Sequence, residues 1–221
     1  MLANVRSAAL LGVDAYLVHV EVDAANGLPC FNIVGLPDAA VKESRDRVKT
    51  AVLNSGLDFP ANRRLTANLA PADLRKEGPC FDLPLALGVL AVLGHFDPEA
   101  LEGCVFTGEL SLDGSLRPVR GALSMALEAR KRGMERLLLP EANAAEAAVV
   151  EGLTVLPLRD LNQARAWLRG EEPIAPAKAD LEALFHRHGQ YPVDFSDVKG
   201  QAPVKRALEV AAAGGPNLLM I

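Results

Sequence analysis

The chain has 221 residues, which is enough for one large domain, or for one medium domain and part of a second. Half of the residues are hydrophobic and can form a real core, while the formal net charge of −5 excludes a general attraction to nucleic acid or to an anionic membrane. The three cysteines are far apart and form no C-x-x-C pair, which fits the reducing cytoplasm better than a disulfide scaffold or a zinc site.

The first residues lack the apolar core of a signal peptide, and no apolar run approaches the roughly 20 residues of a membrane span. We therefore expect no association with a membrane. Alternating apolar residues predict a strand over 15–22, and short extended runs predict strands over 31–34 and 64–70. Between the last two, apolar residues recur at helical spacing over 39–54, and a Ser-Gly pair ends this helix.

The middle of the chain predicts a buried helix. Asp82 is suited to be its N-cap, and residues 83–93 are apolar on every face, which is typical of a central core helix. Strands and helices then alternate to residue 168, which together with the first third predicts a mixed domain of about 170 residues. The elements expected after the buried helix are strands over 104–110, 136–139 and 154–158 and helices over 121–132, 141–150 and 161–168.

The last fifty residues predict a linker and part of another domain. Glycine and proline mark residues 170–178 as a linker, and residues 180–188 have a helical pattern. An extended segment at 197–199, a helix over 203–213 and a buried strand at 218–221 resemble the opening of an ATPase domain of the AAA+ class. The sequence contains no G-x-x-x-x-G-K-[ST] phosphate loop, so we expect an ATPase cut before that loop. An ordinary final helix and strand is the alternative.

Several long motifs carry a resemblance to a known family. They read GLPDAAVKESRDRVK at 35–49, continuing to NSG at 54–56, then KEG at 76–78, FDLPLAL at 81–87, GQ at 200–201 and AAAGGPNLLMI at 211–221. Together they closely resemble the YifB/ComM family of magnesium-chelatase-like AAA+ ATPases. The resemblance implies a Lon-protease-like domain joined to an ATPase domain that uses ATP and Mg²⁺. It also implies a hexameric ring that acts on DNA as a branch-migration helicase in natural transformation and recombination.

The resulting expectation is an α+β fold in three parts. Residues 1–169 form a Lon-protease-like domain of the ribosomal-protein-type two-layer kind, 170–193 a linker with a short helix, and 194–221 the first strand, helix and strand of the ATPase domain. The first part is expected to be an accessory or oligomerisation domain without catalysis of its own. The rival functions are a chelatase-like ATPase that remodels a protein partner and a cysteine-dependent peptidase.

The peptidase alternative depends on two positions. Residues 106–121, FTGELSLDGSLRPVRG, resemble the core of the Lon proteolytic domain, which uses a Ser-Lys dyad. The run KEGPC at 76–80 matches the K-D-G-P-S pattern and places Cys80 at the nucleophile position. The position of the dyad lysine is Leu123, or Ser124 with a slip of one residue, and neither side chain is a base at pH 7. We therefore expect no proteolysis.

The remaining candidates have weaker support. The resemblance places Val198, Gly200 and Gln201 near the adenine of ATP, with negligible affinity in the absence of a phosphate loop. His186 and His188 are two residues apart and would point in different directions on a helix, so no metal site is expected. A final group is either a basic face or part of a mixed solvated surface: Arg45, Arg47, Lys49, Arg63, Arg64, Arg75 and Lys76.

Overall fold

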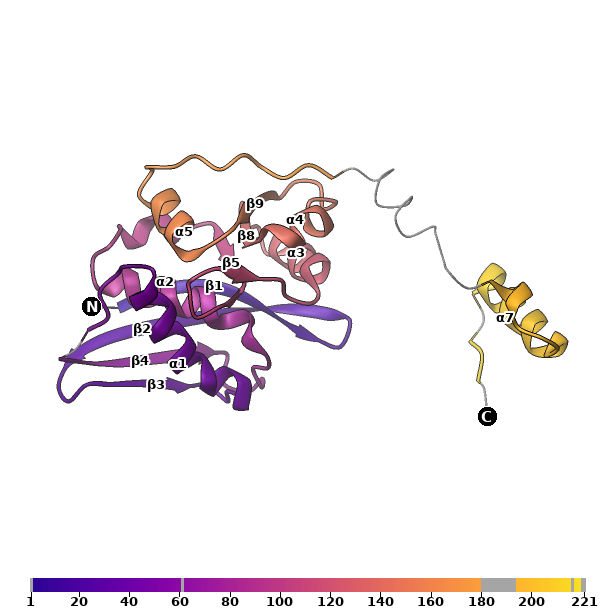
Figure 1. The fold of residues 1–221 in the computed structure, drawn as a ribbon, viewed down its shortest axis with the longest axis horizontal. Coiled ribbons are helices and arrows are strands. Elements are labelled where there is room, and N and C mark those ends of the chain that lie inside the picture. Colours follow the sequence, from indigo (N-terminus) through magenta and orange to yellow (C-terminus); the bar gives the residue numbers. More distant parts are fainter. Residues whose placement is uncertain (1, 61, 180–193, 216, 220–221) are drawn as a thin grey trace. The chain divides into compact units, whose positions relative to one another are not determined.

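The computed structural model describes residues 2–60, 62–179, 194–215 and 217–219 (Figure 1). The chain divides into two compact units, Met1–Ala179 and Asp180–Ile221, which are described separately. Among the described residues, no helix is both long and apolar enough to cross a membrane. The predicted helix over 180–188, with His186 and His188, lies outside the described residues.

The first unit is built on one seven-stranded sheet with the order β3-β4-β2-β1-β5-β8-β9. The pairs β1–β2 and β2–β4 are antiparallel and the other four pairs are parallel, so the fold is mixed α/β with a mostly parallel sheet. The strands are β1 (Leu2–Leu11), β2 (Asp14–Asn26), β3 (Cys30–Val34), β4 (Arg63–Ala70), β5 (Cys104–Phe106), β8 (Arg136–Pro140) and β9 (Thr154–Leu158). A separate hairpin pairs β6 (Glu109–Leu110) with β7 (Leu116–Arg117).

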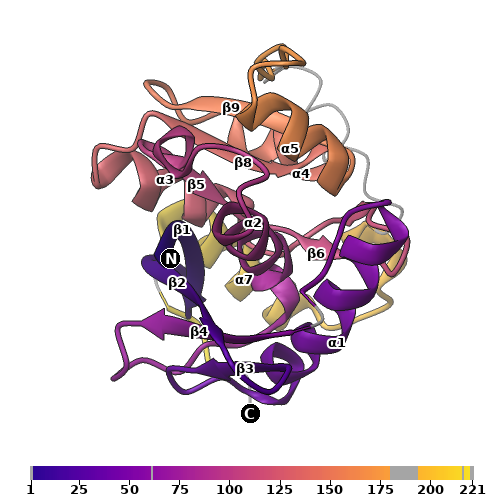
Figure 2. The ribbon, with the colours of Figure 1, turned by 90° about the vertical axis from the view of Figure 1, so that its left-hand side faces the viewer.

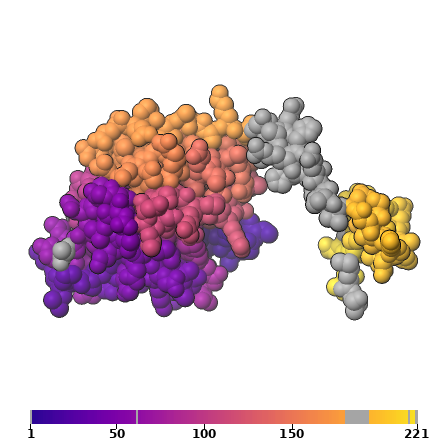
Figure 3. Space-filling model, in the orientation of Figure 1, coloured from indigo at the N-terminus to yellow at the C-terminus, as the bar shows by residue number. Residues whose placement is uncertain are grey.

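Five helices pack on this framework. They are α1 (Ala39–Asn54), α2 (Asp82–Val92), α3 (Ala122–Lys131), α4 (Glu141–Ala147) and α5 (Leu161–Leu168), with short 3₁₀ turns η1 (Pro79–Phe81) and η2 (Pro98–Leu101). Helix α1 contacts α2 and the edge strand β3, while α3 and α4 contact each other and β8. In the space-filling view, the indigo-to-purple part and the pink-to-orange part of this unit lie against each other (Figure 3).

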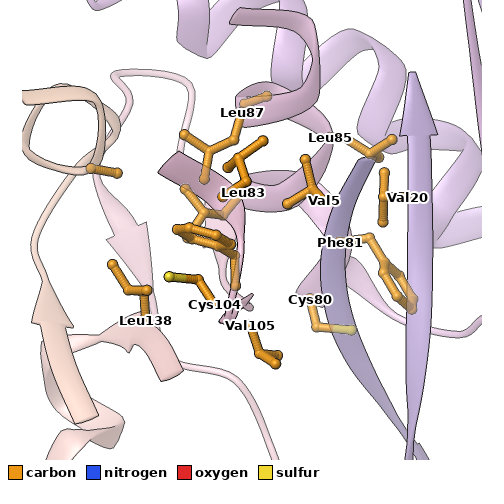
Figure 4. Close-up of a cluster of buried hydrophobic side chains, with 14 of the residues drawn as sticks. Val5, Val20, Cys80, Phe81, Leu83, Leu85, Leu87, Cys104, Val105 and Leu138 are labelled. Carbon is orange, nitrogen blue, oxygen red and sulfur yellow. The ribbon is translucent and has the colours of Figure 1, made fainter. Parts of the chain in front are cut away.

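Helix α2 is the centre of the core, as the sequence predicts. All of its residues are buried, and it packs on β1 and β2 (Figure 2). Its Leu83, Leu85 and Leu87 lie in the cluster drawn in Figure 4 with Val5 and Val20. A Cβ atom at Gly88 would lie 2.4 Å from Cγ2 of Val22, so glycine lets this helix approach β2 closely.

Asp82 is not the N-cap that the sequence predicts. It is the first residue of α2, and its carboxylate is fully buried. Oδ2 accepts hydrogen bonds from Nε of Arg47 at 2.8 Å and from the backbone N–H of Leu110 at 3.2 Å, and Oδ1 accepts one from Nη2 of Arg47 at 3.1 Å. The partner lies 35 residues away on α1, so local capping rules could not identify it. The carboxylate fastens α2 to α1 and β6.

Two other elements differ from the sequence prediction. Strand β1 was not predicted, because Ser7, Ala8 and Ala9 are buried in succession and interrupt the alternation. The single strand expected over 104–110 is divided into β5 and β6. The backbone N–H of Gly108 donates to the carbonyl of Cys80, and its carbonyl accepts from Leu83, so the chain turns here from the sheet toward η1 and α2.

Residues 170–179 carry no helix or strand and pack on the rest of the first unit. The backbone N–H of Ala177 donates to the carbonyl of Val155 at 2.8 Å, and the side chains of Ile174 and Ala177 lie against the core. This segment follows the surface beside β9 (Figure 1).

The second unit contains the 3₁₀ turn η3 (Phe195–Asp197) and helix α7 (Ala202–Gly214). The extended segment predicted at 197–199 begins in η3. The buried strand predicted at 218–221 is wrong at Leu218 and Leu219, which have no regular structure and are exposed, and its last two residues lie outside the described residues. A strand needs a hydrogen-bonded neighbour, and the described residues of this unit include none.

Candidate functional site

The two motifs GLPD and KEG, about forty residues apart in sequence, lie side by side in the structure. The carboxylate of Asp38 joins them: Oδ1 accepts the N–H of Val41 at 2.7 Å as the N-cap of α1, and Oδ2 accepts the N–H of Gly78 at 3.2 Å. The backbone adds two bonds, from Asp38 N–H to the carbonyl of Lys76 and from Lys76 N–H to the carbonyl of Leu36. This pairing fixes the loop that leads to Cys80.

A cleft of about 520 Å³ opens beside this loop. It collects side chains from the start of α1, the loop before α2, the β6–β7 hairpin and the turn before α3. The lining residues are Leu10, Asp38, Glu77, Gly78, Pro79, Cys80, Glu109, Pro118, Val119, Arg120 and Met125. Three carboxylates and one guanidinium therefore face the same space as the thiol.

The Cys80 thiol is held in its protonated form. Only 8% of the residue is exposed, and burial, with smaller contributions from the charges of Asp82 and Asp38, raises its pKa to about 12. Its Sγ lies 3.9 Å from the carbonyl oxygen of Glu77. Because the thiolate is the reactive form of cysteine, this environment suppresses nucleophilic attack.

The residue at the position of the dyad lysine is not a base. Neither Leu123 nor Ser124 lines the cleft. The N–H of Leu123 donates to Oε1 of Glu146 at 3.1 Å, and the hydroxyl of Ser124 donates to the carbonyl of Val13 at 2.8 Å. No lysine or histidine side chain is among the described residues that line the cleft.

Lys76 does not supply the missing base. Its side chain is fully buried, and Nζ donates to the carbonyl oxygens of Pro71 and Leu74. Burial lowers the pKa of this amine, but the hydrogen bonds direct it into its own loop. The sequence prediction that Lys76 could belong to a basic face is wrong.

We expect Cys80 to be far less reactive toward iodoacetamide than the exposed Cys30. With a pKa of about 12, only about one Cys80 thiol in ten thousand is a thiolate at pH 8. That fraction rises about tenfold for each unit of pH up to the pKa. Peptide mass spectrometry of the alkylated, folded protein measures both rates. Equal labelling of the two cysteines at pH 8 would contradict this description of the cleft.

The three residues expected near adenine form a short connection in the second unit. Val198 is exposed and leads from η3 to Gly200, while Gln201 has a left-handed backbone, with φ of 57°, immediately before α7. Lys205 donates to the carbonyl oxygen of Val198. Their role in binding remains a prediction.

Sequence reasoning missed the four charged residues of the cleft. Asp38, Glu77, Glu109 and Arg120 come from separate segments and meet only through the fold. Asp38 had a signal, because an aspartate just before a helical pattern is a typical N-cap. Glu109 and Arg120 had no such signal in the sequence. The described ranges contain no group of three or more His, Cys, Asp or Glu side chains arranged to hold a metal ion.

Two family models match the chain. The model described as subunit ChlI of Mg-chelatase matches residues 20–143, and the one described as magnesium chelatase, subunit ChlI, matches residues 194–221. The first match covers both the GLPD and KEG motifs and the residues that line most of the cleft.

Curated relatives give the same assignment. The competence protein ComM of Haemophilus influenzae is 42% identical over 221 residues, covering 100% of this chain and 43% of that protein. The YifB protein of Escherichia coli is 43% identical over 223 residues, covering 100% of this chain and 42% of its own length. A Lon protease of Mycolicibacterium smegmatis is 25% identical over 164 residues, which are 69% of this chain and 21% of that protein. The chain thus spans about two fifths of the length of its YifB and ComM relatives, and it belongs to the YifB/ComM family of magnesium-chelatase-like AAA+ proteins.

Proposed function

We propose that residues 1–169 form a Lon-protease-like accessory domain without proteolytic activity, which is joined by residues 170–193 to the start of an AAA+ ATPase domain at 194–221. The observation that carries this proposal is the cleft around Cys80. It has a thiol at the position expected of the Lon nucleophile, with a pKa of about 12, and the described residues that line it include no amine or imidazole. The similarity to a Lon protease supports the assignment of the domain type.

Loss of the base leaves the domain with a structural role. The motifs that carry the family resemblance are used here to fasten α1, α2 and the β6–β7 hairpin together through Asp38 and Asp82. We propose that the resulting rigid unit helps to assemble a hexameric ring in the cytoplasm.

We further propose that the full-length protein is an ATP-driven motor that remodels DNA branches during recombination. The similarity to the competence protein ComM of Haemophilus influenzae supports a role of the full-length protein in competence. ATP and Mg²⁺ would bind the complete ATPase domain. Val198, Gly200 and Gln201 alone are expected to bind ATP with negligible affinity, because the sequence has no phosphate loop.

The chain of 221 residues is expected to hydrolyse no ATP above the buffer blank, whereas the full-length protein should hydrolyse ATP faster when branched DNA is added. A phosphate-release assay on both proteins, with and without DNA, measures the difference. Activity of the short chain that persists after repurification would contradict the proposal for the second unit. A full-length protein whose rate of ATP hydrolysis does not change when branched DNA is added would contradict DNA as the proposed substrate.

The chain is also expected to leave unfolded casein intact, because Cys80 has no base. Gel analysis of casein after long incubation, with the Cys80→Ala variant as the matched control, tests this. Cleavage by the parent chain that disappears in Cys80→Ala would show that the cleft is an active peptidase site.

The second candidate function is a chelatase-type ATPase that remodels a protein partner. It is favoured by the match of residues 194–221 to the magnesium chelatase model. The same assay separates the two functions, because this candidate predicts an ATPase rate that a protein partner raises and DNA does not.

A further inference from the structure

Strand β3 forms one edge of the seven-stranded sheet. Among the described residues its one strand neighbour is β4, to which it pairs in parallel from Cys30–Arg64 to Val34–Asn68. Alternate residues of an edge strand direct their N–H and C=O groups away from the sheet, where they can pair with another chain. Figure 1 shows this edge at the bottom of the first unit, below α1.

Two adjoining clefts follow this edge. The larger, of about 670 Å³, lies between the start of β3 and the second half of α1, and the smaller, of about 410 Å³, lies between the end of β3 and the first half of α1. Phe31, Asn32 and Arg45 line both clefts, so they form one continuous depression. We call this depression the β3 groove.

The β3 groove is strongly basic in an acidic protein. Its cationic side chains are Lys42, Arg45, Lys49, Arg63 and Arg64, and Asp46 is the one acidic residue among the described residues that line it. Arg45 pairs with Asp46 at 3.2 Å, but both side chains are more than half exposed, so this pair is weak. The other cations expected on a basic face lie outside the groove: Arg47 pairs with Asp82, Arg75 lies beside Glu77, and Lys76 is buried inside its own loop.

The floor of the groove is apolar. Phe31 and Phe59 lie with their ring centroids 6.1 Å apart, and Leu53 lines the same cleft from α1 and is exposed. Phosphates would pair with the cations but would leave the free backbone groups of the strand unused. An extended peptide satisfies the cations and the backbone together when the side chains that it directs toward α1 are acidic, since successive side chains of a strand point to opposite faces of the sheet.

A second copy of this chain is a poor occupant. Pairing two β3 strands would bring the cations of α1 and β4 that flank this edge in both copies close together, and their repulsion would oppose the pairing. Strand β3 itself carries no charged residue, so these cations are not the edge-strand charges that serve only to prevent self-association.

We propose that the β3 groove binds an acidic, extended segment of a partner protein, which adds to β3 as a further strand of the sheet. The backbone of β3 would supply the pairing. Arg45, Lys49 and their cationic neighbours would select acidic side chains.

Fluorescence anisotropy with a labelled peptide of alternating glutamate and valine tests the proposal on the whole 221-residue chain. Three further probes serve as comparisons: the peptide with lysine in place of glutamate, two forms methylated on alternate backbone nitrogens, and labelled oligothymidylate. The Arg45→Glu/Lys49→Glu variant tests the groove. The control is Lys131→Glu, since Lys131 is exposed on α3 and outside the groove.

We expect the acidic peptide to bind the parent chain. The lysine peptide should bind the parent chain at least about tenfold more weakly, and so should the acidic peptide with the Arg45→Glu/Lys49→Glu variant, because close charge pairs are lost in both cases. Lys131→Glu should leave binding unchanged. One methylated form should lose binding and the other retain it, because an added strand directs only alternate N–H groups toward β3. Absence of binding by the acidic peptide would overturn the proposal, as would equal behaviour of the two methylated forms. Tighter binding of oligothymidylate with the same sensitivity to the variant would identify the groove as a nucleic-acid surface instead.

Discussion

Replacing Leu87 by alanine is expected to lower the free energy of unfolding by about 2–5 kcal/mol. The side chain is fully buried in α2, in the cluster that joins this helix to β1 and β2 (Figure 4). Truncation removes buried methyl groups and leaves a cavity, because the surrounding side chains relax only in part. Denaturant melts followed by circular dichroism measure the loss.

Lys131→Ala is the matched control for this experiment. Lys131 is exposed in the last turn of α3, so its removal should change stability by no more than about 0.5 kcal/mol. If Leu87→Ala lowered the free energy of unfolding by no more than the control does, α2 would not be the centre of the core.

Replacing Asp82 by alanine is expected to cost about 3–5 kcal/mol, as for other broken buried ion pairs, and therefore more than the roughly 1 kcal/mol of a lost helix cap. The carboxylate has no exposed surface, and its removal leaves the guanidinium of Arg47 and the N–H of Leu110 without their acceptor. The side chain of Arg47 is 22% exposed, so water will partly compensate, and the loss should fall toward the lower end of this range.

A double-mutant cycle separates the ion pair from the packing of each side chain. Arg47→Met together with Asp82→Leu should be more stable than Asp82→Leu alone, because the double variant leaves no buried charge without a partner. Chemical denaturation of the parent, both single variants and the double variant measures the coupling. Losses that simply add would show that the two side chains do not act as a pair.

The sequence predicts those elements whose signals are local. Helix α1 has an N-cap aspartate at its start and a Ser-Gly pair at its end, so its bounds over 39–54 are confirmed. Helix α5 and strand β9 are confirmed for the same reason, as short periodic runs between clear turns.

The elements that were missed depend on distant partners. Strand β1 is specified by its neighbours β2 and β5, and the small buried residues Ser7, Ala8 and Ala9 obscure its alternation. The break in the strand predicted over 104–110 depends on Cys80 and Leu83, which bind Gly108 through the backbone.

The candidate site shows the same division. The motif that carries Cys80 is local, and it identified the position that the cleft surrounds. The hydrogen-bond partners of Asp82 and Lys76 could not be predicted from the sequence. Asp82 binds an arginine 35 residues away, and Lys76 binds backbone carbonyls that depend on the path of its own loop. The β3 groove is also a product of folding, since it combines residues of β3, α1 and β4.

The strand order carries a consequence for synthesis of the protein. Strands β1 to β4 come from the first 70 residues and β5, β8 and β9 from residues 104–158, and the two halves of the sheet meet at the single register pair of Arg6 with Val105. A chain made from its N-terminus therefore completes the first half while the edge of β1 still has no partner. Such an edge is prone to pair with other chains. Until residues 104–106 can pair with β1, that edge is therefore open to aggregation.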